Sequence, residues 1–340
     1  MIVEEEIPLK DHTTFKIGGP VRLFITCESA EDVPQAVRRA REQGLATYPL
    51  GEGSNVLASD EPIEKAILKI AIPGIEYEEK EDLTFVTVGA GVSWDTLVTQ
   101  TTEKGLWGLE NLAGIPGTVG SAAVQNIGAY GAVFADCVTS VDAYDTTTDT
   151  FHTLDRESCA FGYRDSVFKR RSGELIVVRV TLALASIPQP SLDYRDIAEY
   201  FKDAPEPALC DIRDAVRSIR AKKFPDLRAY GTAGSFFLNP VLQESQAQLI
   251  AAKYPGMPLF PMPEGGVKVP IAWLLDYRHG VLDLRDLRVG QAFVWPAQTL
   301  VLTTSSGATA RDVDALALEI ARRLFEATGI TAEREVRTLA

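Results

Sequence analysis

The chain has 340 residues, of which 46% are hydrophobic and 24% are charged, and its formal net charge is −13. These proportions are ordinary for a globular protein of two or three structural units. The acidic balance argues against a nucleic-acid partner, because affinity for phosphate backbones comes from Lys and Arg. The four cysteines and three histidines are scattered and no C-x-x-C occurs, so the sequence supports neither a metal site nor a disulfide framework.

No segment of the sequence predicts export or membrane insertion. The first residues, MIVEEE, are acidic and lack the apolar stretch of a signal peptide. The longest apolar run, at about 175–185, contains Arg179 and is too short to span a bilayer. We therefore expect a cytoplasmic protein without a membrane partner, and we further expect a monomer.

Residues 1–70 predict a small βαβ unit. Two apolar strands flank a segment with apolar residues at helical spacing, namely Val33, Ala36, Val37 and Ala40. The second strand leads into a glycine turn at 51–55, GEGSN. Ligands of α/β proteins bind at the carboxyl ends of strands, so this turn is a candidate binding loop.

Residues 108–131 form the most unusual stretch of the chain. Glycine occupies six of its twenty-four positions, and Glu110 is its only charged residue. Glycine suits backbone with positive φ that approaches a ligand closely, and successive N–H groups in such loops bind anions. The stretch matches neither the P-loop nor the Rossmann fingerprint. A third glycine turn, at 89–93, precedes a predicted helix. Together the turns favour a long ligand with a central diphosphate; a buried turn that only packs is the alternative.

The chain becomes β-rich after residue 131, and one arginine is notable there. The motif YRD at 163–165 lies among apolar residues, and an arginine in such surroundings usually has an anionic partner. The proline-containing segment 186–210 predicts a boundary with an inserted loop or a short helix.

The last third of the chain predicts helices separated by short strands. A helix is expected at about 208–222, and a Gly-Ser turn followed by a short aromatic strand at 231–240. Thr309 and Asp312 predict a capping pair at the start of the last helix. The tail at 332–340 alternates like a strand.

Four motifs in this order and spacing resemble one enzyme family. NLAGIPGTVGSAAVQNIGAYG, GYRDSVFK, GTAGSFFLNP and EREVR are similar to motifs of UDP-N-acetylenolpyruvoylglucosamine reductase, also called UDP-N-acetylmuramate dehydrogenase. HTTFKIGG and GEGSNVLASD fit the opening of that family, so the resemblance spans about residues 11–337. The segment that holds Tyr194 resembles the subgroup in which a tyrosine-bearing loop covers the substrate.

The resemblance implies an α+β protein. An FAD-binding region of the vanillyl-alcohol-oxidase/PCMH type would take residues 1–205, as a βαβ lobe at about 1–70 and a β-rich lobe at about 71–205. A C-terminal α+β substrate domain would take residues 206–340, and its final strand would return to the active site. FAD would be bound non-covalently, because no histidine lies in a recognisable attachment motif.

The implied reaction uses NADPH to reduce the enolpyruvyl ether of UDP-N-acetylglucosamine to UDP-N-acetylmuramate, through FAD, in peptidoglycan precursor synthesis. Two alternatives stay open on the residues alone. One is an FAD oxidase of the same superfamily that acts on an alcohol or a sugar. The other is a non-catalytic module that binds a flavin or a nucleotide sugar.

The resemblance also implies roles for single residues. Arg164 would hold the substrate carboxylate and stabilise developing charge, Ser235 would give a proton to the substrate carbon, and Glu335 would polarise the carboxylate or its bound water. The implied FAD contacts are Gly51, Gly53, Ser54, Asn55, Gly114, Ile115, Gly117, Thr118, Gly120, Gln125, Asn126, Ile127 and Gly128. The implied substrate contacts are Tyr163, Tyr194, Lys223, Asn239, Lys268 and Gln298. Two departures from the family pattern are Leu238, where a basic residue is common, and WPA at 295–297, where histidine is common.

Overall fold

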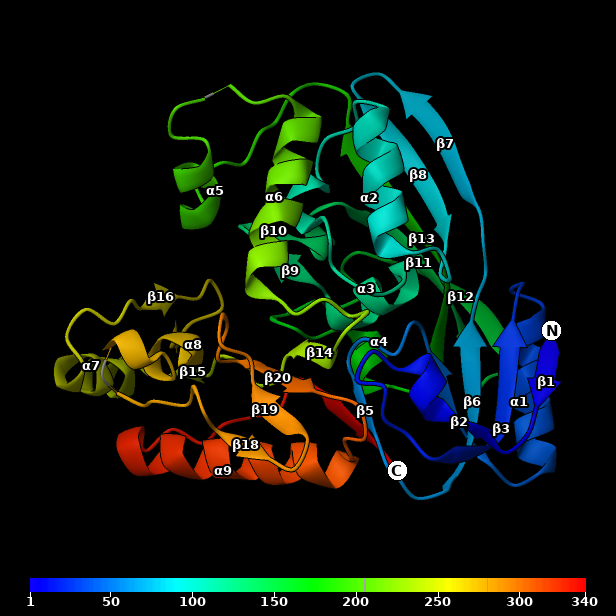
Figure 1. Cartoon of the computed structure of the whole chain (residues 1–340). Helices are drawn as coiled ribbons and strands as arrows, with labels where there is room; N and C mark the ends of the chain where they lie inside the picture. The colour runs from blue at the N-terminus through cyan, green and yellow to red at the C-terminus, as the bar shows by residue number, and fades with distance from the viewer. Residues whose placement is uncertain (205, 280) are drawn as a thin grey trace. The chain divides into compact units, whose positions relative to one another are not determined.

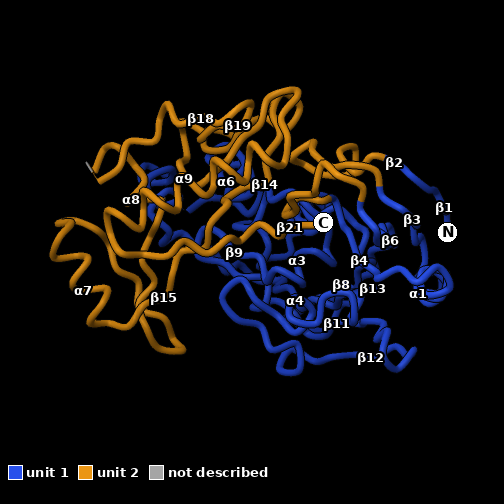
Figure 2. The backbone as a smooth tube through the Cα atoms, turned by 90° about the horizontal axis from the view of Figure 1, so that it is seen from below, with its two compact units in different colours: residues 1–7, 21–52, 63–220 blue, residues 8–20, 53–62, 221–340 orange. Residues whose placement is uncertain are grey.

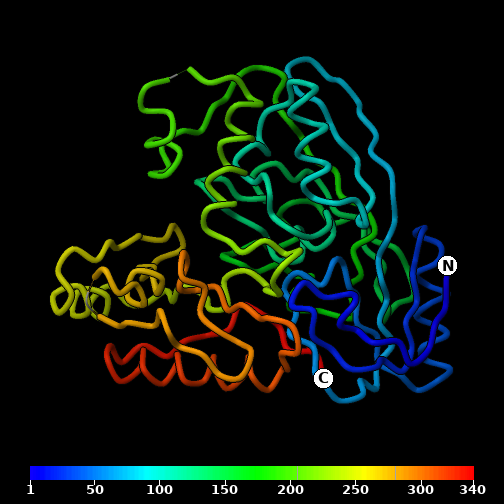
Figure 3. Tube along the Cα trace, in the orientation of Figure 1, coloured from blue at the N-terminus to red at the C-terminus, as the bar shows by residue number. Residues whose placement is uncertain are grey.

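The computed structural model describes residues 1–204, 206–279 and 281–340 (Figure 1). These residues form two compact units, each assembled from separated stretches of the chain (Figure 2). Figure 3 shows the course of the chain from the N-terminus to the C-terminus by colour. Unit 1 consists of residues 1–7, 21–52 and 63–220, and unit 2 consists of residues 8–20, 53–62 and 221–340.

The division between the units differs from the boundary predicted after residue 205. It follows Arg220, within helix α6 (Leu209–Lys223). Two short segments expected in the first lobe, 8–20 and 53–62, belong to unit 2. The physical reason for the later division is the apolar face of α6, which is part of the core of unit 1 and consists of Leu209, Ile212, Ala215, Val216 and Ile219.

The first sheet of unit 1 contains the predicted βαβ motif. Its strand order is β1-β3-β6-β4, with β3 and β4 parallel to β6 and β1 antiparallel to β3. Helix α1 connects β3 to β4 and buries the four apolar residues that the sequence pattern selected, Val33, Ala36, Val37 and Ala40. The bounds are β1 Ile2–Glu4, β3 Pro20–Cys27, α1 Asp32–Glu42, β4 Ala46–Leu50 and β6 Ile63–Ile70.

The second sheet of unit 1 is antiparallel throughout, in the order β12-β11-β13-β8-β7. Its central strand β13 alternates in burial, and Val180, Leu182 and Leu184 are fully buried. This is the β-rich lobe that the sequence predicted. The bounds are β7 Ile75–Lys80, β8 Leu83–Gly89, β11 Val138–Asp145, β12 Thr150–Asp155 and β13 Leu175–Ala185.

Helices and a hairpin lie between and after these strands of unit 1. Helix α3 contacts both β13 and β8, and α4 contacts β13. The bounds are α2 Trp94–Glu103, η2 Glu110–Leu112, α3 Val119–Gln125, β9 Gly128–Ala129, β10 Ala132–Val133, η3 Phe134–Asp136, α4 Val167–Arg170 and α5 Arg195–Tyr200.

The glycine-rich stretch is not the continuous loop that its composition predicted, because α3 lies inside it. Thr118 Oγ1 accepts the N–H of Ser121 and Ser121 Oγ accepts the N–H of Thr118, which is a reciprocal capping box. A Cβ at Gly120 would lie 2.9 Å from Ala90 Cβ. The glycine therefore lowers helix propensity but permits a close approach between α3 and the end of β8.

Unit 2 is a separate α+β unit. Its main sheet has the order β14-β20-β19-β18, and α9 packs on β18, β19 and β20. The predicted capping box of α9 is present, since Thr309 Oγ1 accepts the N–H of Asp312 at 3.1 Å. The bounds are β14 Gly231–Ser235, β18 Arg288–Val289, β19 Ala292–Val294, β20 Val301–Thr304 and α9 Ala310–Thr328.

Smaller elements complete unit 2. A three-stranded sheet has the order β15-β17-β16, and the last strand, β21, runs parallel to β5. Along the described ranges no helix combines the length and the apolar character that crossing a membrane requires. The remaining bounds are β2 Ile7–Pro8, η1 Leu9–His12, β5 Val56–Ala58, β15 Val241–Leu242, α7 Glu244–Lys253, β16 Phe260–Pro261, β17 Val267–Lys268, α8 Ile271–Leu274, η4 Tyr277–His279 and β21 Arg337–Leu339.

Gly231 allows β14 to pack against the N-terminal segment of unit 2. A Cβ at this position would clash with the carbonyl oxygen of Phe15 and with Thr304 Oγ1. We predict that Gly231→Ala lowers the free energy of unfolding by roughly 1–3 kcal/mol, as overpacking does in well-packed cores. Denaturant titration measures this change.

Gly162→Ala is the matched control, because its Cβ would meet only Asp165 Cβ at 3.8 Å. We expect it to change the unfolding free energy by less than about 0.5 kcal/mol. Equal denaturation midpoints for the two variants would contradict the packing argument.

Candidate functional site

The turns at 51–52 and 117–118 lie together in unit 1. The N–H of Gly117 donates to Glu52 Oε2 at 2.9 Å, and a Cβ at Gly51 would lie 2.7 Å from Thr118 Oγ1. The carbonyl oxygen of Gly51 accepts a hydrogen bond from Lys69 Nζ. The two glycine turns that the sequence selected are therefore close neighbours, and a side chain at Gly51 would displace the Thr118 hydroxyl.

Sequence reasoning missed Lys69, which is partly buried on β6. Burial lowers the pKa of Lys69, and the nearby Glu52 carboxylate acts in the opposite direction. The signal in the sequence was a lysine inside the otherwise apolar run AILKI. Lys69 places a positive charge beside a turn that contains no Lys or Arg of its own.

The turn at 114–117 is held at both ends by the first turn of α2. The N–H of Gly114 donates to Asp95 Oδ1 at 2.7 Å, and the N–H of Trp94 donates to the carbonyl of Gly117 at 2.9 Å. The second bond pairs the first N–H of α2, and the preceding residue, Ser93, makes no side-chain cap hydrogen bond. Gly114 and Gly117 both have positive φ, 69° and 129°, so the predicted need for glycine here is confirmed.

The last residue of α3, Gln125, contributes a buried acceptor to unit 1. Gln125 Oε1 is buried and has no hydrogen-bond partner among the described residues. Leaving such an atom unpaired costs about 1–3 kcal/mol. Asn126 has a left-handed backbone, with φ 42°, and its Nδ2 donates to the Gly162 carbonyl at 2.8 Å. Ile115 and Ile127 are partly buried apolar residues against the core.

Arg164 lies in unit 1 in a constrained turn. Its φ is 53°, a conformation that costs a non-glycine residue about 1–3 kcal/mol. Arg164 Nη2 donates to the Gly128 carbonyl at 2.6 Å, and Lys169 Nζ donates to the Arg164 carbonyl at 2.8 Å. The guanidinium is 6.0 Å from the ring centroid of Tyr163. Thus Arg164, Tyr163 and Gly128, which the sequence analysis selected separately, lie together.

Tyr194 immediately precedes α5, and its ring packs edge-on against Tyr130 with centroids 5.3 Å apart. Asn111 Nδ2 donates to the carbonyls of Tyr130 and Ser191, both at 2.9 Å. The segment before α5 is therefore attached to the glycine-rich stretch, while 45% of Tyr194 remains exposed. The tyrosine-loop assignment stays a prediction.

Ser235 and Glu335 lie on neighbouring segments of unit 2. Ser235 is the last residue of β14, and the N–H of Glu335 donates to the carbonyl of Phe236 at 2.9 Å. Phe237 and Arg334 form an antiparallel bridge. The tail of the chain thus lies beside the strand that ends at Ser235, while the final strand β21 pairs with β5. That this place is the active site stays a prediction.

The other part of the GEGSN turn fixes this tail. Asn55 Nδ2 donates to the carbonyl of Glu335 at 3.2 Å, and the N–H of Arg337 donates to the carbonyl of Asn55. Gly53, Ser54 and Asn55 belong to unit 2, whereas Gly51 belongs to unit 1. Asn55 therefore has a structural role in unit 2 beside the cofactor role that the resemblance implied.

The predicted substrate contacts of unit 2 occupy several places. Asn239 Oδ1 accepts the N–H of Ile271 at 2.9 Å. Lys268 is on β17, opposite Val241 in the register, with Nζ 5.6 Å from the Phe260 ring centroid. Register and sequence bring Asn239 and Lys268 to the same end of the small sheet. Lys223 ends α6, and Gln298 lies in the turn between β19 and β20.

Comparisons with known proteins agree in what they identify. A family model described as an FAD-binding domain matches residues 21–154, and one for the C-terminal domain of UDP-N-acetylenolpyruvoylglucosamine reductase matches residues 226–339. The enzyme of that name from Cupriavidus pinatubonensis is 40% identical over 97% of both chains, and that from Ralstonia nicotianae is 37% identical over 98% of both. The crystal structure of the reductase from Thermus caldophilus has a TM-score of 0.68 and 27% identity, over the full length of both chains. The expected α+β class with an FAD-binding region is confirmed.

Unit 1 fits an FAD molecule on observations of its own. The close approach of Gly51 to Thr118 and the positive φ of Gly114 and Gly117 form glycine-dependent turns, a backbone geometry that suits a diphosphate. The unpaired Gln125 Oε1 suits a donor such as a flavin ring N–H. Among the described residues no cluster of three or more His, Cys, Asp or Glu forms a metal site.

If Gln125 Oε1 binds FAD, removing it should lower FAD affinity without lowering the stability of the apoprotein. Gln125→Met removes the unpaired oxygen, so the apoprotein should be equally stable or more stable. FAD affinity should fall roughly three- to tenfold, the effect of one lost hydrogen bond. Denaturant titration and flavin-fluorescence titration measure the two quantities. Gln43→Met, at an exposed site, should change neither; a loss of apoprotein stability with FAD affinity unchanged would show that Gln125 is structural.

Proposed function

Because the chain belongs to the UDP-N-acetylenolpyruvoylglucosamine reductase family, we propose that it reduces the enolpyruvyl ether of UDP-N-acetylglucosamine to UDP-N-acetylmuramate. FAD is its cofactor and NADPH its electron donor, and the reaction is a step in peptidoglycan precursor synthesis. The observation that supports this most strongly is the pairing of the Ser235 segment with the Glu335 segment in unit 2. A reaction that needs a proton donor next to an acidic group requires such a pairing.

The two units divide the work in this proposal. Unit 1 holds FAD through the glycine turns, with Lys69 adding positive charge near the diphosphate. Unit 2 binds the substrate, with its uridine diphosphate near Lys223, Asn239, Lys268 and Gln298. When bound there, FAD would supply the hydride-transfer chemistry that links NADPH to the terminal vinyl carbon of the enol ether. The remaining chemistry is the work of side chains.

Three side chains handle the charge and the proton. Addition at the vinyl carbon develops negative charge on the adjacent carbon and its carboxylate, and Arg164 stabilises that charge, which is worth about 10²–10³ in rate for one preorganised donor. The Ser235 hydroxyl then gives its proton to that carbon and regains one from solvent. Glu335 polarises the carboxylate or its bound water. Arg164 is prepared for this role by its bond to Gly128 and by the Lys169 contact.

Several finer features belong to the same proposal. We infer a monomeric, cytoplasmic enzyme, because all the proposed residues come from one chain and both substrates are nucleotide metabolites. The net charge of −13 is unfavourable for binding nucleic acid. We also infer that FAD is held non-covalently. His152, on the exposed side of β12, has its Nε2 in a hydrogen bond with Thr150 Oγ1 at 2.9 Å.

Product analysis tests the function. Under anaerobic conditions, purified enzyme with NADPH should convert the enolpyruvyl ether to a product heavier by two hydrogen atoms, identified by mass spectrometry. Without the ether it should consume no more than the one equivalent of NADPH that reduces its flavin. Reduction of the bound flavin by an alcohol or a sugar, with no reduction by NADPH, would instead identify an oxidase. Flavin binding without any turnover would identify a binding module.

Ser235→Ala separates the two halves of the reaction. We predict that NADPH still reduces the flavin at nearly the parent rate, whereas the enol ether is reduced at least a hundredfold more slowly, because general acid catalysis contributes roughly 10²–10⁴. Anaerobic stopped-flow absorbance measures both steps. Ser306→Ala, an exposed serine of unit 2, is the control and should behave like the parent. Equal loss of both steps would mean that Ser235 is structural.

Tyr194→Phe tests the covering segment. Loss of one hydrogen bond to the substrate should weaken substrate binding about three- to tenfold and leave flavin reduction by NADPH unchanged. Tyr200→Phe, at the last residue of α5 and 49% exposed, should leave the dissociation constant as it is. An identical substrate affinity in Tyr194→Phe and the parent would remove Tyr194 from the substrate site.

A further inference from the structure

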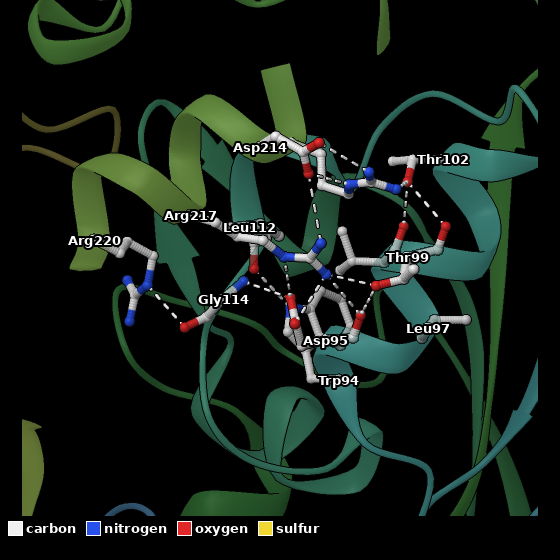
Figure 4. A network of polar contacts seen from close by, with 12 residues as sticks. Trp94, Asp95, Leu97, Thr99, Thr102, Leu112, Gly114, Asp214, Arg217 and Arg220 are labelled. Carbon is white, nitrogen blue, oxygen red and sulfur yellow. Dashed lines mark hydrogen bonds and ion pairs between the residues drawn. The ribbon is translucent and has the colours of Figure 1, made fainter. Parts of the chain in front are cut away.

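Gly114 is fixed by polar contacts on both its backbone groups (Figure 4). Its N–H donates to Asp95 Oδ1 at 2.7 Å, and its carbonyl accepts from Arg220 Nε at 2.9 Å. A Cβ on Gly114 would meet the side chains of Arg220 and Arg217 at 3.4–3.5 Å. The shape of the 114–117 turn is therefore set by side chains from α2 and α6, which are distant in sequence.

Arg217 joins α6 to α2 through the same carboxylate. Its Nη2 donates to Asp95 Oδ2 at 2.9 Å and to Thr99 Oγ1 at 2.5 Å, and its Nε donates to Asp95 Oδ1 at 3.3 Å (Figure 4). Asp95 thus accepts hydrogen bonds from a backbone N–H of the turn and from a guanidinium. Because Asp95 lies beside a turn proposed to receive a diphosphate, its negative charge would repel the ligand unless a cation balanced it.

The contacts of the turn leave one backbone donor available. Gly114 and Gly117 give their N–H groups to Asp95 and Glu52, and Pro116 has no N–H. The N–H of Ile115 has no acceptor among the described residues. A diphosphate oxygen suits this donor, because backbone N–H groups in turns bind anions.

The surroundings of Arg220 also favour an anion near this turn. Burial lowers the pKa of Arg220, and the charge of Arg164 lowers it further, while Tyr130 and Asp95 act in the opposite direction. Burial and the Arg164 charge both make the charged form of the Arg220 guanidinium less favourable. A bound anion in this part of unit 1 would reduce that cost.

We propose that Asp95 and Arg217 are positioning residues for FAD: Asp95 holds Gly114 so that the Ile115 N–H faces the diphosphate, and Arg217 neutralises the Asp95 charge. This inference rests on the proposed function, because it takes the 114–117 turn as part of the FAD site. Neither residue touches the reacting atoms. Both act on the strength of FAD binding through the backbone of the turn.

The test is FAD binding to the apoprotein, measured by quenching of flavin fluorescence. Arg217→Gln leaves the Asp95 carboxylate unbalanced and should raise the FAD dissociation constant about tenfold, the scale of a hydrogen bond to a charged group. Adding Asp95→Asn removes that charge but keeps the acceptor for Gly114, so the double variant should recover to within about threefold of the parent. Asp95→Ala removes the acceptor as well and should stay about tenfold weaker.

Asp214→Asn is the matched control. Asp214 lies on α6 and its Oδ1 is 3.6 Å from Arg217 Nη1, but no contact joins it to Gly114 in the described structure. The FAD affinity of the Asp214→Asn variant should equal that of the parent. The ³¹P NMR signal of the bound diphosphate should shift in Asp95→Ala and stay in place in Asp214→Asn, and apoprotein melting temperatures report any general loss of structure.

The outcomes separate the inference from the function on which it rests. If the parent takes up no FAD, the proposed function fails. If the parent binds FAD and Arg217→Gln binds it equally well, or if Asp95→Asn does not restore the Arg217→Gln variant, the positioning role fails and the function stands. Should Asp95→Ala not fold, the Arg217→Gln variant and its Asp95→Asn partner decide the matter, since both keep the acceptor for Gly114.

Discussion

The hydrogen bond from the Glu335 N–H to the Phe236 carbonyl, 2.9 Å long, is the contact on which the proposed chemistry of unit 2 depends. It joins the tail of the chain to the strand that ends at Ser235, and Asn55 holds the Glu335 carbonyl from the other side. Backbone hydrogen bonds place both segments side by side. In the proposed chemistry, this arrangement would hold the proton donor and the acidic group through the backbone.

In unit 1, close approach between backbone segments positions the glycine turns. Gly51 meets Thr118, and Gly120 meets Ala90, at distances that a Cβ would not allow. These contacts bring three glycine turns to one region of unit 1. Charge is added from outside the turns, by Lys69 at Gly51 and by Arg220 at Gly114. The composition of the glycine stretch alone suggested backbone dipoles as the main support, and the structure adds these two cations.

Local patterns in the sequence predicted local structure well. The Thr309/Asp312 pair gave the start of α9, and helical spacing selected the residues that α1 buries. The family motifs also led to Arg164, Ser235 and Glu335, and their roles stay predictions. Long-range contacts were harder to foresee. Nothing near Asp95 in the sequence indicates Arg217, and the place of α6 in unit 1 depends on an apolar face whose partner the sequence does not name. Helix α3 was missed because glycine disfavours helices in isolation, whereas its close packing against Ala90 compensates.

A crystal structure of the enzyme with FAD and the enolpyruvyl ether tests the central claim most directly. The account predicts that the Ser235 hydroxyl lies within about 3–3.5 Å of the carbon next to the carboxylate, the distance of a reactive contact. It also predicts that Arg164 and Glu335 both contact that carboxylate. A complex in which any of these three side chains points away from the enolpyruvyl group, with another donor in its place, would contradict it.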